Sequence, residues 1–210
     1  VFMFIFSTVL RIRVSEFETG TDSFFIYFLS GYFPWLIFSE SLNRSVNILI
    51  ENANLITKVS FPVELLPAGT VISSFLINGI GMVLFYGYLI LTGYLEITCI
   101  LVPLVIIPLH ILFISGISYI LAALCVFIRD MRDILGLILM VWFYATPIIY
   151  PVSMVPESFS AIINLNPMVW FLELYRGTSL MHQITWFPLL QVTSLSILTY
   201  CLGAWFFMRA

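Results

Sequence analysis

The sequence predicts an all-α membrane protein with six transmembrane helices, the first of them truncated, and short re-entrant helices before the last span. Hydrophobic residues make up 61% of the 210 and charged residues only 9%, whereas soluble domains carry about 25% charged residues. The three longest stretches without Asp, Glu, Lys or Arg each exceed the ~20 apolar residues that a spanning helix needs: Leu65–Leu95, Ile97–Ile128 and Gly177–Met208. They are continuously apolar, which indicates helices, because a membrane barrel would show alternating strands.

The expected spans follow one another along the chain. Val1–Leu10 is apolar but too short to cross, and it has neither the basic region nor the cleavage site of a signal peptide. It resembles the second half of a first span that ends near Ile12, so we expect the natural protein to have further residues before Val1. We place the other spans at residues 24–49, 67–93, 98–127, 134–150 and 186–207. Nothing interrupts them as a linker would, so we expect a single transmembrane domain over residues 1–210.

The segment between the fifth and sixth spans is rich in proline. Pro147, Pro151, Pro156 and Pro167 crowd it, and proline breaks helices. Its charge-free part, Ser158–Leu172, is short for a full span. Irregular backbone at membrane depth must be buried in protein or line a wet cavity. We therefore interpret residues 151–175 as short helices that enter one leaflet and return, with an ordinary extracellular loop as the alternative.

Charged and polar residues interrupt the apolar runs at a few places that could carry function. Glu40 and Arg44 are four residues apart within the second span, and charges there tend to be paired, so we expect an intramembrane ion pair. The segment from Glu51 to Pro67 mixes charges with apolar residues, which favours a short amphipathic helix at the membrane surface over a solvated loop. The three cysteines and two histidines show no metal-ligand spacing, so we expect no metal or cofactor in this chain.

Four segments, in this order, make the chain similar to a known family. They are Gly31–Trp35 (GYFPW), Asn52–Pro62 (NANLITKVSFP), Phe127–Asp133 (FIRDMRD) and Asn166–Arg176 (NPMVWFLELYR). They resemble the permease subunits of ATP-binding cassette exporters for polysaccharides and polyol phosphates, which export O-antigen, capsule or teichoic acid. Val63 departs from the pattern, because many members have a basic residue directly after the Phe-Pro pair.

The resemblance implies a function and a set of partners. The chain would be a permease of the bacterial cytoplasmic (inner) membrane that works as a homodimer with two separate ATPase subunits and moves a lipid-linked glycan. We expect no catalysis by this chain, since it has no phosphate-binding loop motif; ATP and magnesium would bind the partner. No nucleic-acid partner is expected at a net charge of −3. The resemblance also implies a coupling surface, to which we assign Asn54, Leu55, Ile56, Lys58, Val59, Phe61, Pro62, Arg129, Asp130, Arg132 and Asp133.

Aromatic residues are candidates for the wall of a conduit. Sugar rings have apolar faces that stack on aromatic side chains, and such faces attract a glycan without fixing its register. Phe24, Phe28, Tyr32 and Trp35 share one face of a helix. The candidates are Tyr32, Trp35, Trp142, Tyr144 and Tyr150. Packing in a core or a dimer interface is the alternative explanation for these residues.

Two other functions remain open at this point. Asp130 and Asp133 lie three residues apart, so on a helix they share a face and could hold Mg²⁺ near a phosphate. That pair favours a membrane enzyme acting on lipid-linked phosphates, although opposite charges closing a tight turn between spans explain it better. A small-molecule exporter of the same architecture is the other alternative.

Overall fold

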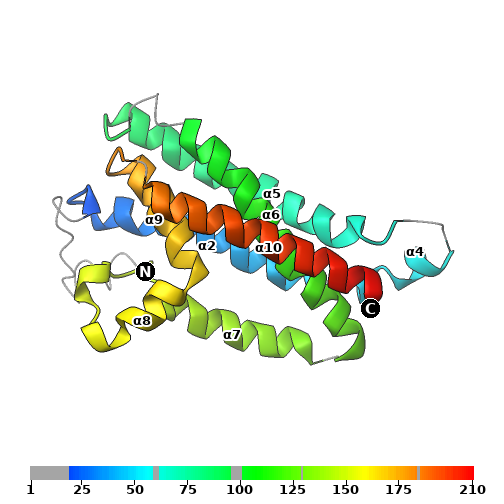
Figure 1. Cartoon of the computed structure of the whole chain (residues 1–210). Coiled ribbons are helices and arrows are strands. Elements are labelled where there is room, and N and C mark those ends of the chain that lie inside the picture. The colour runs from blue at the N-terminus through cyan, green and yellow to red at the C-terminus, as the bar shows by residue number, and fades with distance from the viewer. Residues whose placement is uncertain (1–18, 59–61, 96–100, 129, 184) are drawn as a thin grey trace. The chain divides into compact units, whose positions relative to one another are not determined.

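The computed structural model describes residues 19–58, 62–95, 101–128, 130–183 and 185–210. Its long helices are α2 (Phe24–Ser45), α5 (Leu65–Leu91), α6 (Leu101–Phe127), α7 (Met131–Ala145) and α10 (Trp186–Arg209). Shorter helices join them: α3 (Ile48–Glu51), α4 (Ala53–Lys58), the 3₁₀ turn η3 (Val152–Met154), α8 (Glu157–Leu165) and α9 (Pro167–Ser179). The described residues form helices and no strand (Figure 1), so the all-α prediction is confirmed for this part of the chain.

In the part of the chain that the structure describes, three helices are long and apolar enough to cross a membrane. They are Leu65–Leu91, Pro103–Phe127 and Trp186–Arg209. Helices α2 and α7 also occupy expected positions, but α7 has only 15 residues, so the six-span count stays a prediction. The first expected span lies outside the described residues. Short helices do fill the proline-rich segment, as η3, α8 and α9, and their entry into a leaflet also stays a prediction.

The chain divides into two compact units, each built from three stretches. Unit 1 takes its residues from Val1–Trp35, Gly81–Ile106 and Trp142–Val192, and unit 2 from Leu36–Ile80, Ile107–Val141 and Thr193–Ala210. The boundaries fall inside α2, α5, α6, α7 and α10, so each of these helices contributes one part to each unit.

Unit 1 packs α9 inside a shell of other helices. Ten of the 13 residues of α9 are buried, among them Phe171, Tyr175 and Arg176. A second cluster joins Ile26, Phe85, Leu89, Leu95 and Leu180. Helix α9 is therefore a core helix of unit 1, which fits its short length.

Unit 2 has a core of aromatic pairs and close helix contacts. Phe38 stacks on Phe113 with ring centroids 6.0 Å apart, and Phe75 meets the ring of His110 edge-on at 5.5 Å. Helices α6 and α10 approach backbone to backbone where Gly116 faces Thr199 and Gly203. Ser45 and Thr70 share a hydrogen bond of 2.7 Å between α2 and α5, so small and hydroxyl side chains set the helix spacing here.

Candidate functional site

The segment assigned to coupling forms two short exposed helices. Neither α3 nor α4 has a buried residue. Asn54, Leu55 and Lys58 are exposed and Ile56 is half-buried. Asn52 connects the two helices. Its backbone N–H and its side-chain Nδ2 donate to the carbonyl of Ile48 on α3, at 3.2 and 2.9 Å, and its own carbonyl accepts from the amides of Leu55 and Ile56 on α4, at 2.9 and 3.1 Å. An exposed leucine on a helix without a core is available to a partner. Val59 and Phe61 lie outside the described residues, and Pro62 follows them as an exposed residue.

The second loop assigned to coupling starts α7. The carbonyl of Asp130 accepts hydrogen bonds from the amides of Asp133 and Ile134, both at 3.1 Å, so Asp130 opens the helix. Asp130, Arg132 and Asp133 are exposed, and Arg129 lies outside the described residues. Among the residues that the structure describes, no group of three or more His, Cys, Asp or Glu side chains could hold a metal ion. Asp130 and Asp133 therefore have no further ligand-type side chain beside them in that part of the chain.

Glu40 and Arg44 lie close together on α2, in unit 2. Arg44 Nη1 is 3.6 Å from Glu40 Oε1, and both side chains are partly exposed. The other carboxylate oxygen of Glu40 accepts a hydrogen bond of 2.8 Å from Asn78 Nδ2 on α5. Asn78 lies 38 residues after Glu40 in the chain and is not among the residues predicted from the sequence. The carboxylate of Glu40 therefore links α2 to α5, because it contacts Arg44 on its own helix and Asn78 on the other.

Two of the conduit candidates are packed inside unit 1. Trp35 is 5% exposed, and its ring meets Trp142 at 6.3 Å and Phe143 at 5.7 Å. Trp142 Nε1 donates to Asn166 Oδ1 at 2.8 Å. Tyr32 is half-buried and stacks on Phe28 at 5.1 Å. Trp35 is thus surrounded by protein in this chain, which favours the packing explanation for this residue.

Tyr144 and Tyr150 line an open cavity of about 360 Å³ in unit 1. The hydroxyl of Tyr150 donates to the carbonyl of Tyr144 at 2.9 Å, and Tyr144 is 53% exposed. Phe159 and Ile162 of α8 add apolar side chains to the same wall. Of the five candidates, these two present aromatic surface to a hollow.

Arg176 is a buried site residue that the charge-free runs did not reveal. It lies on α9 at 8% exposure, and its five N–H groups all have acceptors. Nη1 donates to Tyr27 Oη (2.9 Å) and Pro147 O (2.7 Å), Nη2 to Ile148 O (3.1 Å) and Tyr27 O (3.4 Å), and Nε to Ser30 Oγ (3.3 Å). The guanidinium also stacks on the Tyr27 ring at 3.9 Å. Arg176 therefore ties the start of α2 to the turn after α7.

Asn166 is a second residue whose role the sequence analysis missed. It caps α9, since its Oδ1 accepts from Met168 N at 3.0 Å. The same oxygen accepts from Trp142 Nε1, and Nδ2 donates to Thr146 Oγ1 at 2.9 Å. An asparagine directly before a proline is a standard helix-start signal, so the Asn166-Pro167 pair could have located this cap. Asn166 and Arg176 are the two ends of the fourth segment that carried the family resemblance.

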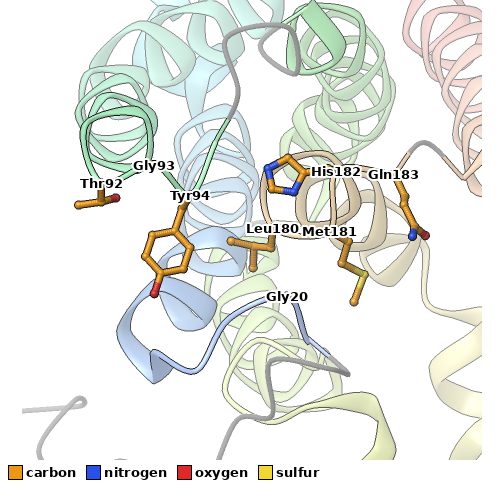
Figure 2. A pocket seen from close by; sticks show the side chains of 8 residues that line it. All are labelled: Gly20, Thr92, Gly93, Tyr94, Leu180, Met181, His182 and Gln183. Atoms are coloured by element: carbon orange, nitrogen blue, oxygen red, sulfur yellow. The ribbon is translucent and has the colours of Figure 1, made fainter.

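A further cavity of unit 1, of about 760 Å³, is lined by residues of loops and turns. Figure 2 shows its lining from three segments: Gly20, then Thr92 to Tyr94, then Leu180 to Gln183. Gly20 and Gly93 have positive φ, and so does His182 at 53°. The left-handed region is uncommon for a residue with a side chain. No charged side chain lines this cavity, so it offers little to fix an ionic or catalytic ligand.

Comparisons with known proteins agree on one family. A family model described as ABC-2 type transporter matches residues 1–180. The chain is 29% identical over 191 residues to the O-antigen export system permease protein RfbA of Myxococcus xanthus, covering 88% of this chain and 69% of the relative. It is 31% identical over 179 residues to RfbA of Klebsiella pneumoniae, covering 84% and 66%.

The polysialic acid transport protein KpsM of Escherichia coli is 29% identical over 159 residues, which are 73% of this chain and 60% of KpsM. The chain thus spans about two thirds of the length of the curated relatives it matches.

Proposed function

The chain belongs to the ABC-2 type transporter membrane family, and from this membership we propose that it is the permease subunit of an ATP-driven exporter. The cargo that we propose is a lipid-linked polysaccharide of the O-antigen or capsule type, carried across the cytoplasmic membrane of a bacterium. The observation that carries this proposal is the set of relatives whose names state export of O-antigen or transport of polysialic acid. The three long apolar helices fit a multi-pass membrane protein.

We propose a separate ATPase as the partner. The 210 residues contain no phosphate-binding loop motif, so we propose that a second chain supplies the energy from ATP. Helix α4 supports a docking site for it, because Leu55 is 37% exposed on a helix that has no buried residue. Apolar residues that stay exposed together usually meet a partner or a membrane. The coupling surface would consist of α4 with the exposed charges at the start of α7.

The conduit that we propose lies along two copies of the chain. Tyr144 and Tyr150 are its best-supported wall residues, since both line an open hollow and their rings can stack on sugars. Tyr32, on the Phe28 stack, is a further candidate. Trp35 and Trp142 would instead support this wall from behind through their mutual packing.

A pair of matched variants on α4 tests the proposal. Leu55→Ser removes an exposed apolar side chain, and Thr57→Ser changes a neighbouring exposed residue with little loss of apolar surface. The measurement is co-purification of the ATPase with the tagged permease, together with glycan export in cells. We expect Leu55→Ser to reduce both, because truncation of an interface anchor often costs ~2 kcal/mol or more, and Thr57→Ser to leave both unchanged. A permease that exports glycan without any ATPase in the complex would refute the proposal.

A further inference from the structure

A second cavity of unit 1, of about 520 Å³, lies beside the buried arginine. Its wall comes from the start of α2, from the turn and η3 after α7, and from α9 with the loop that follows it. Its volume lies within the range of roughly 300–1,000 Å³ that is usual for small-molecule pockets. The cavity is separate from the hollow of Tyr144 and Tyr150, since the two share no lining residue.

The wall combines apolar faces with hydrogen-bonding side chains. Pro151, Val169 and Leu172 supply apolar surface. Glu173 and Gln183 add a carboxylate and an amide, and both side chains are exposed. A sugar ring has this same combination, because its hydroxyls are donors and its C–H faces are apolar. Such a wall fits a sugar better than it fits a lipid tail, which has no hydrogen bonds to offer.

The arginine of this wall does not make an anion site. All five N–H groups of Arg176 already donate to Tyr27, Ser30, Pro147 and Ile148. No donor is left for a phosphate or carboxylate, which Arg normally binds through two N–H groups. The carboxylate of Glu173 in the same wall would also repel an anion. The cavity therefore suits a neutral ligand that donates hydrogen bonds to Glu173.

We propose that this cavity is a saccharide subsite, which binds a neutral sugar ring of the transported glycan with Glu173 as the acceptor for ring hydroxyls. This assignment rests on the export function proposed above and names a place where the cargo touches the permease. One carboxylate and a few apolar contacts make a weak site, of the millimolar kind. Weak binding suits a polymer that has to move on.

The test uses the full-length protein in nanodiscs, with methyl α-D-mannopyranoside and methyl β-D-galactopyranoside as neutral probes and inorganic phosphate as the anion probe. Binding is measured by saturation-transfer NMR and titration. Glu173→Gln removes the carboxylate. Its matched control is Glu157→Gln, at an exposed position of α8 that does not line the cavity. Gel filtration shows whether each variant is folded.

We expect at least one methyl glycoside to bind, and Glu173→Gln to weaken that binding about tenfold or more, since a hydrogen bond to a charged group is worth that much. The control variant Glu157→Gln should bind like the wild type. No binding of either glycoside up to about 50 mM, in the range of such weak sites, would overturn the subsite. Equal binding by Glu173→Gln and Glu157→Gln, or binding of phosphate in place of the sugars, would also overturn it. The α4 variants test the exporter function independently of the sugar site. If the ATPase binds the permease but no sugar binds, only the subsite is rejected. If sugar binds but no ATPase associates with the permease, the exporter function is rejected.

Discussion

Arg176 places a positive charge inside unit 1, where backbone carbonyls take the role of a counter-ion. No carboxylate of the described residues forms a salt bridge with it. The carbonyls of Tyr27, Pro147 and Ile148 and two hydroxyls surround the guanidinium instead. A planar group with five N–H donors fits this arrangement, and an ammonium with three does not. The residue thereby fixes the geometry of the turn that leads from α7 to α8.

We predict that Arg176→Lys destabilises the protein by about 2 kcal/mol or more, because buried acceptors that lose a donor cost roughly 1–3 kcal/mol. The measurement is the apparent melting temperature of the purified protein in detergent. Arg209→Lys is the matched control, since Arg209 is exposed and stacks on Trp205 at 4.8 Å. If both variants have the same melting temperature, the carbonyls and hydroxyls around the Arg176 guanidinium contribute nothing to stability.

Glu173 gives the proposed sugar site a dependence on pH. Partial burial in the cavity wall raises the pKa of its carboxyl above the ordinary value of 4.5. The carboxylate accepts hydrogen bonds from hydroxyls and the protonated acid does so less well, so binding should weaken as the pH falls. Because the pKa is raised, this weakening should begin at a higher pH than for a free glutamate. Tyr27 and Arg176, the other titratable groups of the wall, do not change charge in acid.

The measurement is the affinity for the glycoside probe between about pH 4 and pH 8, a range that begins near the ordinary pKa of a carboxyl group and extends above it. Glu173→Gln should bind weakly and with little change over this range. A pH profile that is the same in the wild type and in this variant would remove Glu173 from the site.

At the scale of helices, two glycines allow the backbones of α6 and α10 to come into direct contact. A Cβ added at Gly203 would lie under 3.0 Å from the backbone of Gly116, and one at Gly116 would meet the backbone of Thr199 and Tyr200. Small residues let membrane helices approach closely, and van der Waals contact between them then drives association.

We predict that Gly203→Leu forces α6 and α10 apart and destabilises the protein by ~1–3 kcal/mol, the usual cost of overpacking. The readout is again the melting temperature in detergent. Gly79→Leu is the matched control, since a Cβ at Gly79 on α5 meets nothing within 4 Å. A Gly203→Leu variant as stable as Gly79→Leu would show that the close contact is dispensable.

The sequence predicted the helices well because their signal is local. The predicted spans 67–93, 98–127 and 186–207 lie within a few residues of α5, α6 and α10, and the Pro-rich segment indicated short helices where η3, α8 and α9 lie. Contacts between distant residues carry no such signal. Arg176 lies 149 residues from the Tyr27 hydroxyl that it binds, and only folding brings them together. For the same reason the spacing of Glu40 and Arg44 indicated an ion pair, while Asn78, on another helix, was missed.

For the aromatic candidates, the sequence does not tell which rings are buried and which line a cavity. Composition and spacing identify Trp35 and Tyr144 equally well as large rings in a span. Their surroundings differ, because Trp35 is 5% exposed and Tyr144 is 53% exposed. Which face of a helix meets the core depends on every neighbouring helix, so a single sequence cannot separate a packing ring from one that lines a cavity.

The whole molecule exposes much apolar surface. Leu91 is 89% exposed on α5, and Trp186 is 72% exposed at the start of α10. Soluble monomers rarely expose contiguous apolar surface of this kind. Lipid or a second copy of the chain would cover such side chains, in agreement with a protein that belongs to a membrane family.

The family resemblance implies cytoplasmic termini, and this gives a prediction for topology. Lys58, on α4, should face the cytoplasm, and Glu157, at the start of α8, should face outward. The test replaces each by cysteine in a chain whose Cys99, Cys125 and Cys201 are changed to serine, followed by labelling of intact cells with an impermeant thiol reagent. We expect label at position 157 and none at position 58 until the cells are opened. Label at position 58 in intact cells would reverse the proposed orientation.

The cage of Arg176 also constrains how this sequence can drift. A methyl group at Gly31 would lie 2.6 Å from Nη2 of Arg176, and five hydrogen bonds hold that nitrogen's guanidinium in place. Alanine at position 31 therefore requires this guanidinium to shift and its cage to loosen, unless position 176 carries a shorter side chain. The cost of a substitution at position 31 thus depends on the residue at position 176, 145 residues further along the chain.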